Sequence, residues 1–142
     1  MAIIEIGRDN FASPFLYHLV GGLDFSWYVL PPRDRSSGIL VGFKDAVFSV
    51  QDVISGDFCI KFRVKNKPDG FLWSLVIVYG AAQDQSKHIF LAELVRICEH
   101  ESLPMLVAGD FNIVRRPEEK NNSNFDAHWP FVFNAIIESL DL

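Results

Sequence analysis

The chain has 142 residues and a formal net charge of −5, and 49% of its residues are hydrophobic. This length predicts one domain or a piece of one, and the apolar content excludes an intrinsically disordered segment. The acidic balance argues against tight, sequence-independent DNA binding by bulk charge, which requires many unopposed lysines and arginines. The sequence has neither a signal peptide pattern nor an apolar run long enough to span a membrane. We therefore expect a soluble, intracellular protein that is not secreted and has no membrane partner.

The first half of the chain predicts β-strands. The short apolar run GILVGF at 38–43 follows turn-like residues. Between 57 and 65 the sequence DFCIKFRVK alternates with a period of two, which predicts a half-buried antiparallel strand. Turn residues at 67–70 and the more apolar run FLWSLVIVYG at 71–80 complete a predicted hairpin. The alternation places Phe58, Ile60, Phe62 and Val64 on one face and Cys59, Lys61, Arg63 and Lys65 on the other. The cationic face is either a track for a DNA backbone or a solvated outer face, and we favour the second.

The second half alternates helices and a strand. Helical spacing of apolar residues predicts a helix that is capped by Asp84 or Ser86 and runs to about His100. The run MLVA at 105–108 is bounded by proline and glycine and predicts a central strand. A last helix is predicted after it, with Asp126 as its cap. Strand pairs followed by strand–helix alternation favour an α/β layered architecture. The two cysteines each lie in an apolar stretch, which predicts buried free thiols.

The segment Gly-Asp-Phe-Asn at 109–112 directly follows the predicted central strand. An extended backbone would place Asp110 and Asn112 on one side and turn Phe111 into the core. The carboxylate can then activate a water, and the amide can donate to a phosphate oxygen. Gly109 would let a neighbouring chain or a ligand come close. The alternative is that Asp110 begins a turn and bonds nearby backbone N–H groups.

Taken together, WSLVIVYG, the following helix, LPMLVAGDFNIVRRPEEKNN and NAIIESLDL resemble the endonuclease/exonuclease/phosphatase superfamily. The closest likeness is to the apurinic-type endonuclease domains of plant LINE-type retrotransposons, and DRSSGILVGF is similar to another segment of these domains. The resemblance implies a four-layer α/β-sandwich, with two mainly antiparallel sheets packed face to face and helices outside. Residues 1–142 would form a partial domain of this kind, truncated at both ends.

The resemblance also implies roles for three residues at strand ends. Asp110 matches the aspartate that positions or activates the attacking water, and Asn112 matches the asparagine that orients the phosphate. Tyr79 matches a tyrosine that hydrogen-bonds the scissile phosphate; alternatively, it is an aromatic residue that ends a buried strand. Mg²⁺ or Mn²⁺ is the cofactor and DNA the partner that the resemblance implies.

Two further positions have open alternatives. Glu5 lies where the family has a metal-ligating glutamate, although only this residue and the basic Arg8 match the family's Gln-Glu-Thr-Lys motif. It is either that ligand or an ordinary charged residue near a frayed terminus. Arg115 and Arg116 directly follow the site, and they either bind phosphates or a flipped nucleotide or form ion pairs with nearby glutamates.

The sequence departs from the resemblance in ways that affect activity. It contains neither the family's upstream asparagine strand nor the Ser-Asp-His segment that supplies an acidic residue and a histidine. We therefore expect the isolated chain to be inactive, and a retrotransposon origin would place it in the nucleus. One alternative is a non-catalytic interaction module that self-associates through open sheet edges. Another is a phosphatase of the same superfamily.

Overall fold

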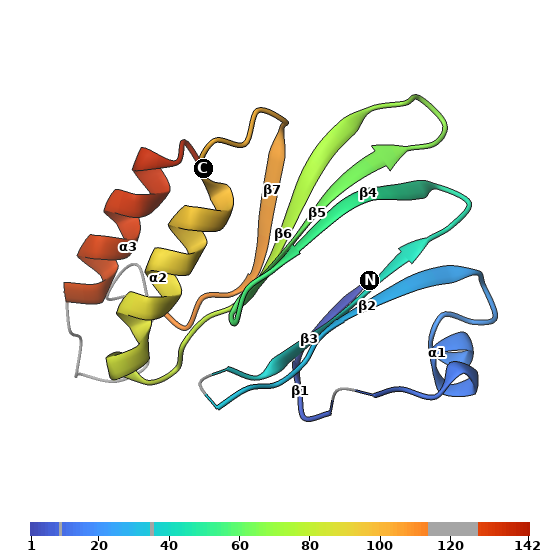
Figure 1. Cartoon of the computed structure of the whole chain (residues 1–142), viewed down its shortest axis with the longest axis horizontal. Helices are drawn as coiled ribbons and strands as arrows, with labels where there is room; N and C mark the ends of the chain where they lie inside the picture. Colours follow the sequence, from blue (N-terminus) through green and yellow to red (C-terminus); the bar gives the residue numbers. More distant parts are fainter. Residues whose placement is uncertain (9, 35, 114–127) are drawn as a thin grey trace.

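A computed structural model describes residues 1–8, 10–34, 36–113 and 128–142, which form two β-sheets and three helices. The three-stranded sheet has the order β1-β3-β2, and the four-stranded sheet has the order β4-β5-β6-β7. Figure 1 shows α2 and α3 on the side of the four-stranded sheet that faces away from the other sheet. The predicted α/β architecture of two mainly antiparallel sheets with helices outside is confirmed. The strands are β1 (Ala2–Ile6), β2 (Phe25–Leu30), β3 (Gly38–Lys44), β4 (Phe48–Ser55), β5 (Cys59–Asn66), β6 (Leu72–Tyr79) and β7 (Met105–Asp110), and the helices are α1 (Ser13–Leu19), α2 (Asp84–Cys98) and α3 (His128–Ser139).

The connections between strands explain their directions. Short turns join β4 to β5 and β5 to β6, and both pairs are antiparallel, as the predicted hairpin requires. Helix α2 connects β6 to β7 as a crossover, and these two strands are parallel. The parallel register brings the last residues of the two strands, Tyr79 and Asp110, side by side. None of the described helices has the length and apolar character of a membrane span.

A first core fills the space between the two sheets. Its aromatic centre is Phe62 of β5, whose ring lies edge-on to Phe43 at 4.9 Å and to Tyr28 at 5.2 Å between ring centroids. Such edge-to-face pairs are favourable beyond the burial of their surface. The buried members of this core come from both sheets and are Leu30, Ile39, Val41, Phe43, Ile60, Phe62, Val64 and Ile77.

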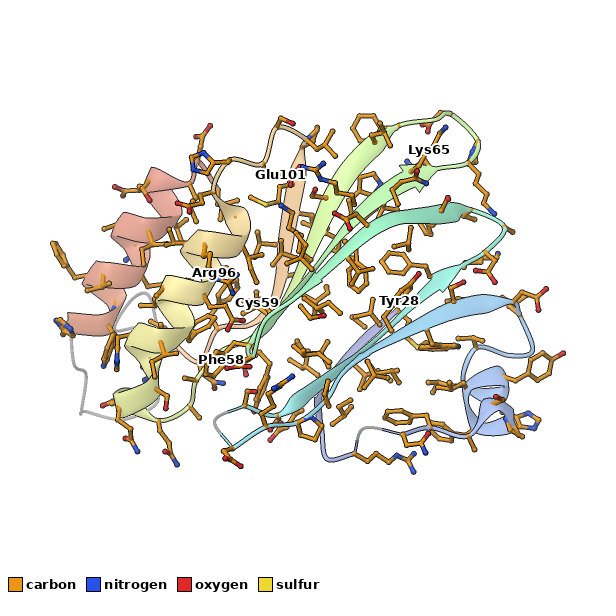
Figure 2. The ribbon with its side chains drawn as sticks, viewed as in Figure 1. Tyr28, Phe58, Cys59, Lys65, Arg96 and Glu101 are labelled. Carbon is orange, nitrogen blue, oxygen red and sulfur yellow. The ribbon has the colours of Figure 1, made fainter. Side chains whose placement is uncertain are left out.

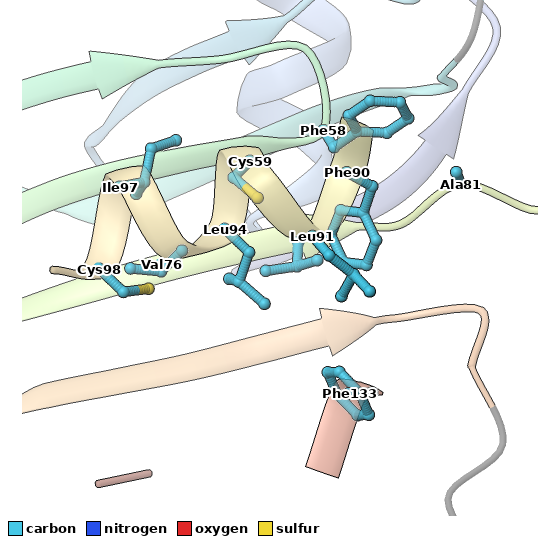
Figure 3. Close-up of a cluster of buried hydrophobic side chains, with 11 residues drawn as sticks. Phe58, Cys59, Val76, Ala81, Phe90, Leu91, Leu94, Ile97, Cys98 and Phe133 are labelled. Carbon is cyan, nitrogen blue, oxygen red and sulfur yellow. The ribbon is translucent and has the colours of Figure 1, made fainter. Parts of the chain in front are cut away.

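A second core lies between the four-stranded sheet and the helices (Figure 3). Val76 and Val78 of β6 face Phe90 and Leu94 of α2, and all four are fully buried. Both cysteines belong to this core as free thiols, as predicted. Burial raises the pKa of both thiols, that of Cys98 to about 11. They are therefore packing residues and poor nucleophiles at neutral pH.

The helices differ in detail from their predicted limits. Helix α2 ends at Cys98, two residues before the predicted limit. Neither Asp84 nor Ser86 caps it, because its N-cap is Gln83, which makes no side-chain capping bond. Helix α1 was not predicted, since its seven residues make fewer than two full turns and none of its side chains is buried. The last helix is present as predicted, but the proposed cap Asp126 lies outside the described residues.

The first half of strand β5 is buried on both faces, whereas Arg63 and Lys65 of the second half are exposed, so the prediction of a half-buried strand holds only for the second half. Lys61 is only 5% exposed, and its Nζ donates to the Ile97 carbonyl at 3.2 Å. The same ammonium forms an ion pair with Glu101, which also contacts Arg63 at 3.4 Å. Lys61 therefore lies neither on a solvated face nor on a track for DNA, because α2 covers it. Figure 2 shows Glu101 at the end of the sheet where β7 begins.

The carboxylate of Glu101 has a perturbed pKa. Burial alone would raise this pKa, but hydrogen bonds from Lys61 and from the Leu103 N–H outweigh burial and lower it below its ordinary value of 4.5. A lowered pKa in the folded state means that the ion pair stabilises the protein above the unfolded-state pKa. This contribution is lost as the pH falls through the folded-state pKa.

We predict that Glu101→Gln lowers the free energy of unfolding by roughly 3–5 kcal/mol at neutral pH, because it leaves the Lys61 ammonium buried without its counter-ion. The difference between wild type and variant should shrink as the pH is lowered below 4.5, the ordinary pKa of this carboxyl group. Urea unfolding at a series of pH values measures both effects.

The matched control is Lys65→Met, which removes an exposed lysine from the same face of β5 and should change stability by less than about 0.5 kcal/mol. The double variant Lys61→Met/Glu101→Leu should recover most of the loss, since apolar replacement of a buried pair is often neutral. A Glu101→Gln variant as stable as wild type would contradict the prediction.

Candidate active site at the ends of β6 and β7

Strands β1, β6 and β7 run toward the same end of the sandwich (Figure 1). Tyr79 and Asp110 are the last residues of β6 and β7 and are register partners. Ile77 and Ala108, two residues earlier on each strand, belong to the core between the sheets. Because side chains alternate along a strand, Tyr79 and Asp110 face the same inter-sheet side. Tyr79 packs against that core, and Asp110 is exposed.

The backbone turns directly after Asp110. The Asn112 N–H donates to Asp110 Oδ1 at 2.8 Å, and Asn112 has a left-handed φ of 52°. The expected extended geometry of 110–112 is therefore wrong, and the alternative of an Asp-initiated turn holds. The physical reason is local: once pairing with β6 ends, the carboxylate offers the backbone N–H a nearby acceptor. A carboxylate has about four acceptor positions, so the turn leaves capacity for a further ligand.

Phe111 turns away from this side, as predicted. Its ring packs against the core under α2 and α3, with its centroid 5.1 Å from that of Phe133. The buried Phe111 ring therefore holds the backbone in place between Asp110 and Asn112.

Gly80 joins the two strand ends. Its N–H donates to the Asp110 carbonyl at 2.7 Å, and its own carbonyl accepts a hydrogen bond from Asn112 Nδ2 at 2.8 Å. The Asn112 amide is thereby held next to the end of β6. A primary amide carries two N–H donors, so one remains for a substrate oxygen.

Two glycines make this close approach feasible. A Cβ on Gly80 would lie 2.3 Å from the Phe111 carbonyl oxygen, and one on Gly109 would lie 2.0 Å from the Val78 carbonyl oxygen. Gly109 also has a φ of 137°, which disfavours other residues. The expectation that a neighbouring chain approaches Gly109 is confirmed, and the neighbour is Val78. Sequence reasoning did not assign the role of Gly80, although a glycine directly after a buried strand signals close backbone contact.

The start of β5 supports Tyr79 from the other side. The Glu93 carboxylate of α2 accepts hydrogen bonds from the backbone N–H groups of Asp57, Phe58 and Cys59 at 2.8–2.9 Å. The Phe58 carbonyl in turn accepts the Tyr79 N–H at 2.9 Å. Helix α2 thus fixes the turn before β5, and that turn fixes the end of β6.

Glu5 occupies a bulge near the end of β1. The pairing of β1 with β3 shifts between Ile4 and Ile6, and Glu5 between them is exposed with a φ of 61°. This left-handed conformation costs a non-glycine residue about 1–2 kcal/mol, and bulges of this kind re-aim a side chain. The neighbouring basic residue Arg8 stacks its guanidinium 4.6 Å from the centre of the Phe11 ring.

The remaining expected site residues, and a metal site, complete the comparison with the sequence. Arg115 and Arg116 lie outside the described residues. Within the described part of the chain, no group of three or more His, Cys, Asp or Glu side chains is gathered closely enough to hold a metal ion. A single exposed carboxylate such as Glu5 still fits Mg²⁺, which commonly keeps several waters and takes further ligands from a substrate phosphate.

The fold and these strand ends define an α/β-sandwich with a polar site at the carboxyl ends of adjacent strands. Residues 1–136 match the sequence profile of the Endonuclease/Exonuclease/phosphatase family, and the chain belongs to this family. A search of curated protein sequences gives no significant match.

Solved structures share the fold at low sequence identity. The human Nocturnin catalytic domain, solved with a bound sulfate anion, is 16% identical with a TM-score of 0.60, and the match covers 98% of this chain and 56% of that one. An endonuclease/exonuclease/phosphatase family protein from Bacteroides thetaiotaomicron is 14% identical with a TM-score of 0.50, covering 85% and 50% of the two chains. The chain therefore spans about half the length of these structures.

We predict that Gly80→Ala and Gly109→Ala each lower the free energy of unfolding by roughly 1–3 kcal/mol, because the added methyl group meets backbone that cannot move aside easily. Gly7→Ala is the matched control, since nothing lies within 4 Å of its added Cβ. Chemical denaturation measures all three. If the two site variants are as stable as the control, the strand ends are not held by the close contacts described above.

Proposed function

We propose that the chain forms part of a metal-dependent phosphodiester-hydrolysing domain of the DNA endonuclease type. The observation that carries this proposal is the register of Tyr79 with Asp110, together with the bond that ties Asn112 to Gly80. A phenol, a carboxylate and a primary amide thus come from two adjacent strand ends. Membership of the Endonuclease/Exonuclease/phosphatase family supports the same reaction class.

Each of the three groups has a chemical role suited to phosphodiester hydrolysis. The exposed Asp110 carboxylate orients and deprotonates the attacking water. The free N–H of the Asn112 amide donates to a phosphate oxygen as negative charge builds on it, and the Tyr79 hydroxyl donates to another. The turn that immobilises Asp110 and Asn112 arranges these donors before the substrate arrives.

Glu5 is the proposed protein ligand of the cation, which is Mg²⁺ or Mn²⁺. When bound, such a cation stabilises the oxygen that leaves the phosphate. The strained backbone at Glu5 supports this role, because strain of this kind collects at functional sites. Arg115 and Arg116 remain proposed substrate contacts on the sequence alone.

The proposed substrate is DNA, and the proposed origin is the endonuclease domain of a plant LINE-type retrotransposon, acting in the nucleus. The support is the likeness of the segments WSLVIVYG, LPMLVAGDFN and DRSSGILVGF to those domains. A gene that encodes no reverse transcriptase after this segment would count against that origin.

We predict that the 142-residue chain does not nick supercoiled plasmid above background with Mg²⁺. The sequence lacks the asparagine, the second acidic residue and the histidine that the resemblance implies, and each such contact is worth roughly 3–4 kcal/mol. Agarose gel electrophoresis of the plasmid measures nicking for wild type and for Asp110→Ala.

The control variant is Asp69→Ala, which removes an exposed aspartate from the turn between β5 and β6. Nicking by wild type and by Asp69→Ala, but not by Asp110→Ala, would overturn the predicted inactivity and support the role of Asp110. Nicking that persists in Asp110→Ala would contradict that role.

We predict that Mn²⁺ broadens NMR signals around Glu5 and the ends of β6 and β7, because a paramagnetic ion relaxes nearby nuclei. Glu5→Gln should abolish this local broadening, since an amide is a weaker ligand for a hard cation. Glu138→Gln, at an exposed glutamate of α3, should leave it intact. Broadening that is unchanged in Glu5→Gln would exclude Glu5 as the metal ligand, whether or not the chain cleaves DNA.

A further inference from the structure

The loop between β2 and β3 lies at the same end of the sandwich as the proposed site. Gly38, the first residue of β3 after this loop, pairs with Ile6, the last residue of β1. The two strands lie so close here that a Cβ on Gly38 would be 2.6 Å from Ile6 Cγ1. The loop therefore ends beside the bulge of β1 that carries Glu5, the proposed metal ligand.

The same loop is bound to the turn between β4 and β5, which belongs to the other sheet (Figure 1). Two backbone hydrogen bonds, of 2.8 and 3.1 Å, join Arg33 and Ser36. The Ser36 hydroxyl then donates to the Asp57 carbonyl at 2.6 Å, and Ser36 is only 9% exposed. Glu93 accepts the Asp57 N–H at 2.9 Å, so the turn itself is held by α2. Arg33 is therefore part of a docked loop.

The Arg33 side chain reaches across to the second sheet. Its Nε lies 3.5 Å from Asp57 Oδ1, and the two side chains are 58% and 50% exposed. In the part of the chain that the structure describes, the guanidinium donates no hydrogen bond. The five N–H donors of an arginine are thus available for a ligand, and their planar arrangement matches the oxygens of a phosphate.

Asp57 brings this guanidinium close to the strand ends of the four-stranded sheet. It directly precedes Phe58, whose carbonyl accepts the Tyr79 N–H at 2.9 Å. The loop that carries Arg33 ends beside the bulge at Glu5, on the other sheet. Arg33 therefore lies between the two parts of the proposed site, the metal ligand on one sheet and the phosphate donors on the other.

We propose that Arg33 binds a phosphate group of the substrate strand, next to the phosphate that is cleaved. This inference rests on the proposed phosphodiester-hydrolysing function. A nucleic acid strand carries one phosphate per nucleotide, so a neighbour of the scissile phosphate lies within reach of the same end of the sandwich. The net charge of −5 means that a polyanion must be bound by cations at defined positions and not by bulk charge.

The alternative role of Arg33 is an ordinary surface ion pair that only fastens the loop. The two explanations can be separated, because the loop is docked through backbone atoms of Asp57. The Asp57 carbonyl binds Ser36, and the Asp57 N–H binds Glu93. Asp57→Asn therefore removes the ion pair but leaves both of these hydrogen bonds and the Arg33 side chain in place.

An NMR titration of the whole chain with a short DNA duplex, without divalent cations, tests the proposal. The amide shifts of Tyr79, Gly80 and Asn112 give the affinity, and the spectra of the free variants show that each is folded. Arg33→Gln should weaken binding by about tenfold, because a charge-assisted hydrogen bond to a phosphate is lost. Asp57→Asn should bind at least as tightly as wild type, because it removes a negative charge near the phosphate.

The matched control is Arg63→Gln, which removes the same charge from another half-exposed arginine. The Arg63 side chain is 45% exposed and forms an ion pair with Glu101 at 3.4 Å. This variant should bind the duplex like wild type. Arg33→Gln should also lower the slope of log affinity against log salt concentration by about one, whereas Arg63→Gln should not change it.

The outcomes separate this inference from the proposed function. Equal weakening by Arg33→Gln and Asp57→Asn would show that the ion pair only fastens the loop, and it would overturn the proposal. Shifts at the strand ends that Arg33→Gln leaves unchanged would also overturn it, while the proposed function would stand. A wild-type chain that shows no shifts at the strand ends with millimolar duplex would overturn both.

Discussion

The burial of β6 on both faces is the constraint on which the rest of the structure depends. Val76 and Val78 face the helices, and Ile77 faces the other sheet. A strand that is apolar on both faces does not select its register by hydrophobic pattern alone, because a one-residue slip still buries apolar side chains. Contacts at the strand end select the register instead, because a Cβ on Gly80 or Gly109 would clash with nearby backbone atoms.

The candidate site is therefore also a structural element. The bonds between Gly80, Asp110 and Asn112 end the parallel ladder and hold the Asp110 carboxylate and the Asn112 amide at the end of β6. Helix α2 contributes from a distance, because its Glu93 holds the turn whose carbonyl binds the Tyr79 N–H. Asp110 therefore has two roles: its bond to Asn112 holds the strand end, and its carboxylate is the proposed base.

Much of this fold could be predicted from local patterns. The hairpin of β5 and β6, the two long helices and the strand before Asp110 all follow from periodicity and turn residues. The burial of Lys61 could not be predicted, because its partner Glu101 is far away in the sequence and only the packing of α2 brings them together. Helix α1 is too short, at seven residues, for its apolar spacing to distinguish a helix from a loop.

The residues of the candidate site could be predicted from the sequence, but their arrangement could not. The resemblance identified Tyr79, Asp110 and Asn112, whereas their adjacency depends on a parallel register set by the α2 crossover. The sequence left the turn at Asn112 and continued extension as open alternatives, because an Asp side chain competes with extension only where the pairing with β6 stops. The strained backbone at Glu5 has no sequence signal, since glutamate rarely adopts a positive φ.

Strand β7 shows how the fold limits the composition of the site. Met105 and Val107 pack toward the helices, and Ala108 packs toward the other sheet, so a charged residue or a proline in the middle of the strand would damage a core or its ladder. A polar side chain can therefore be placed only at the ends of the strand. At the carboxyl end this position is Asp110, whose carboxylate accepts the Asn112 N–H and so fixes the backbone where the pairing with β6 stops.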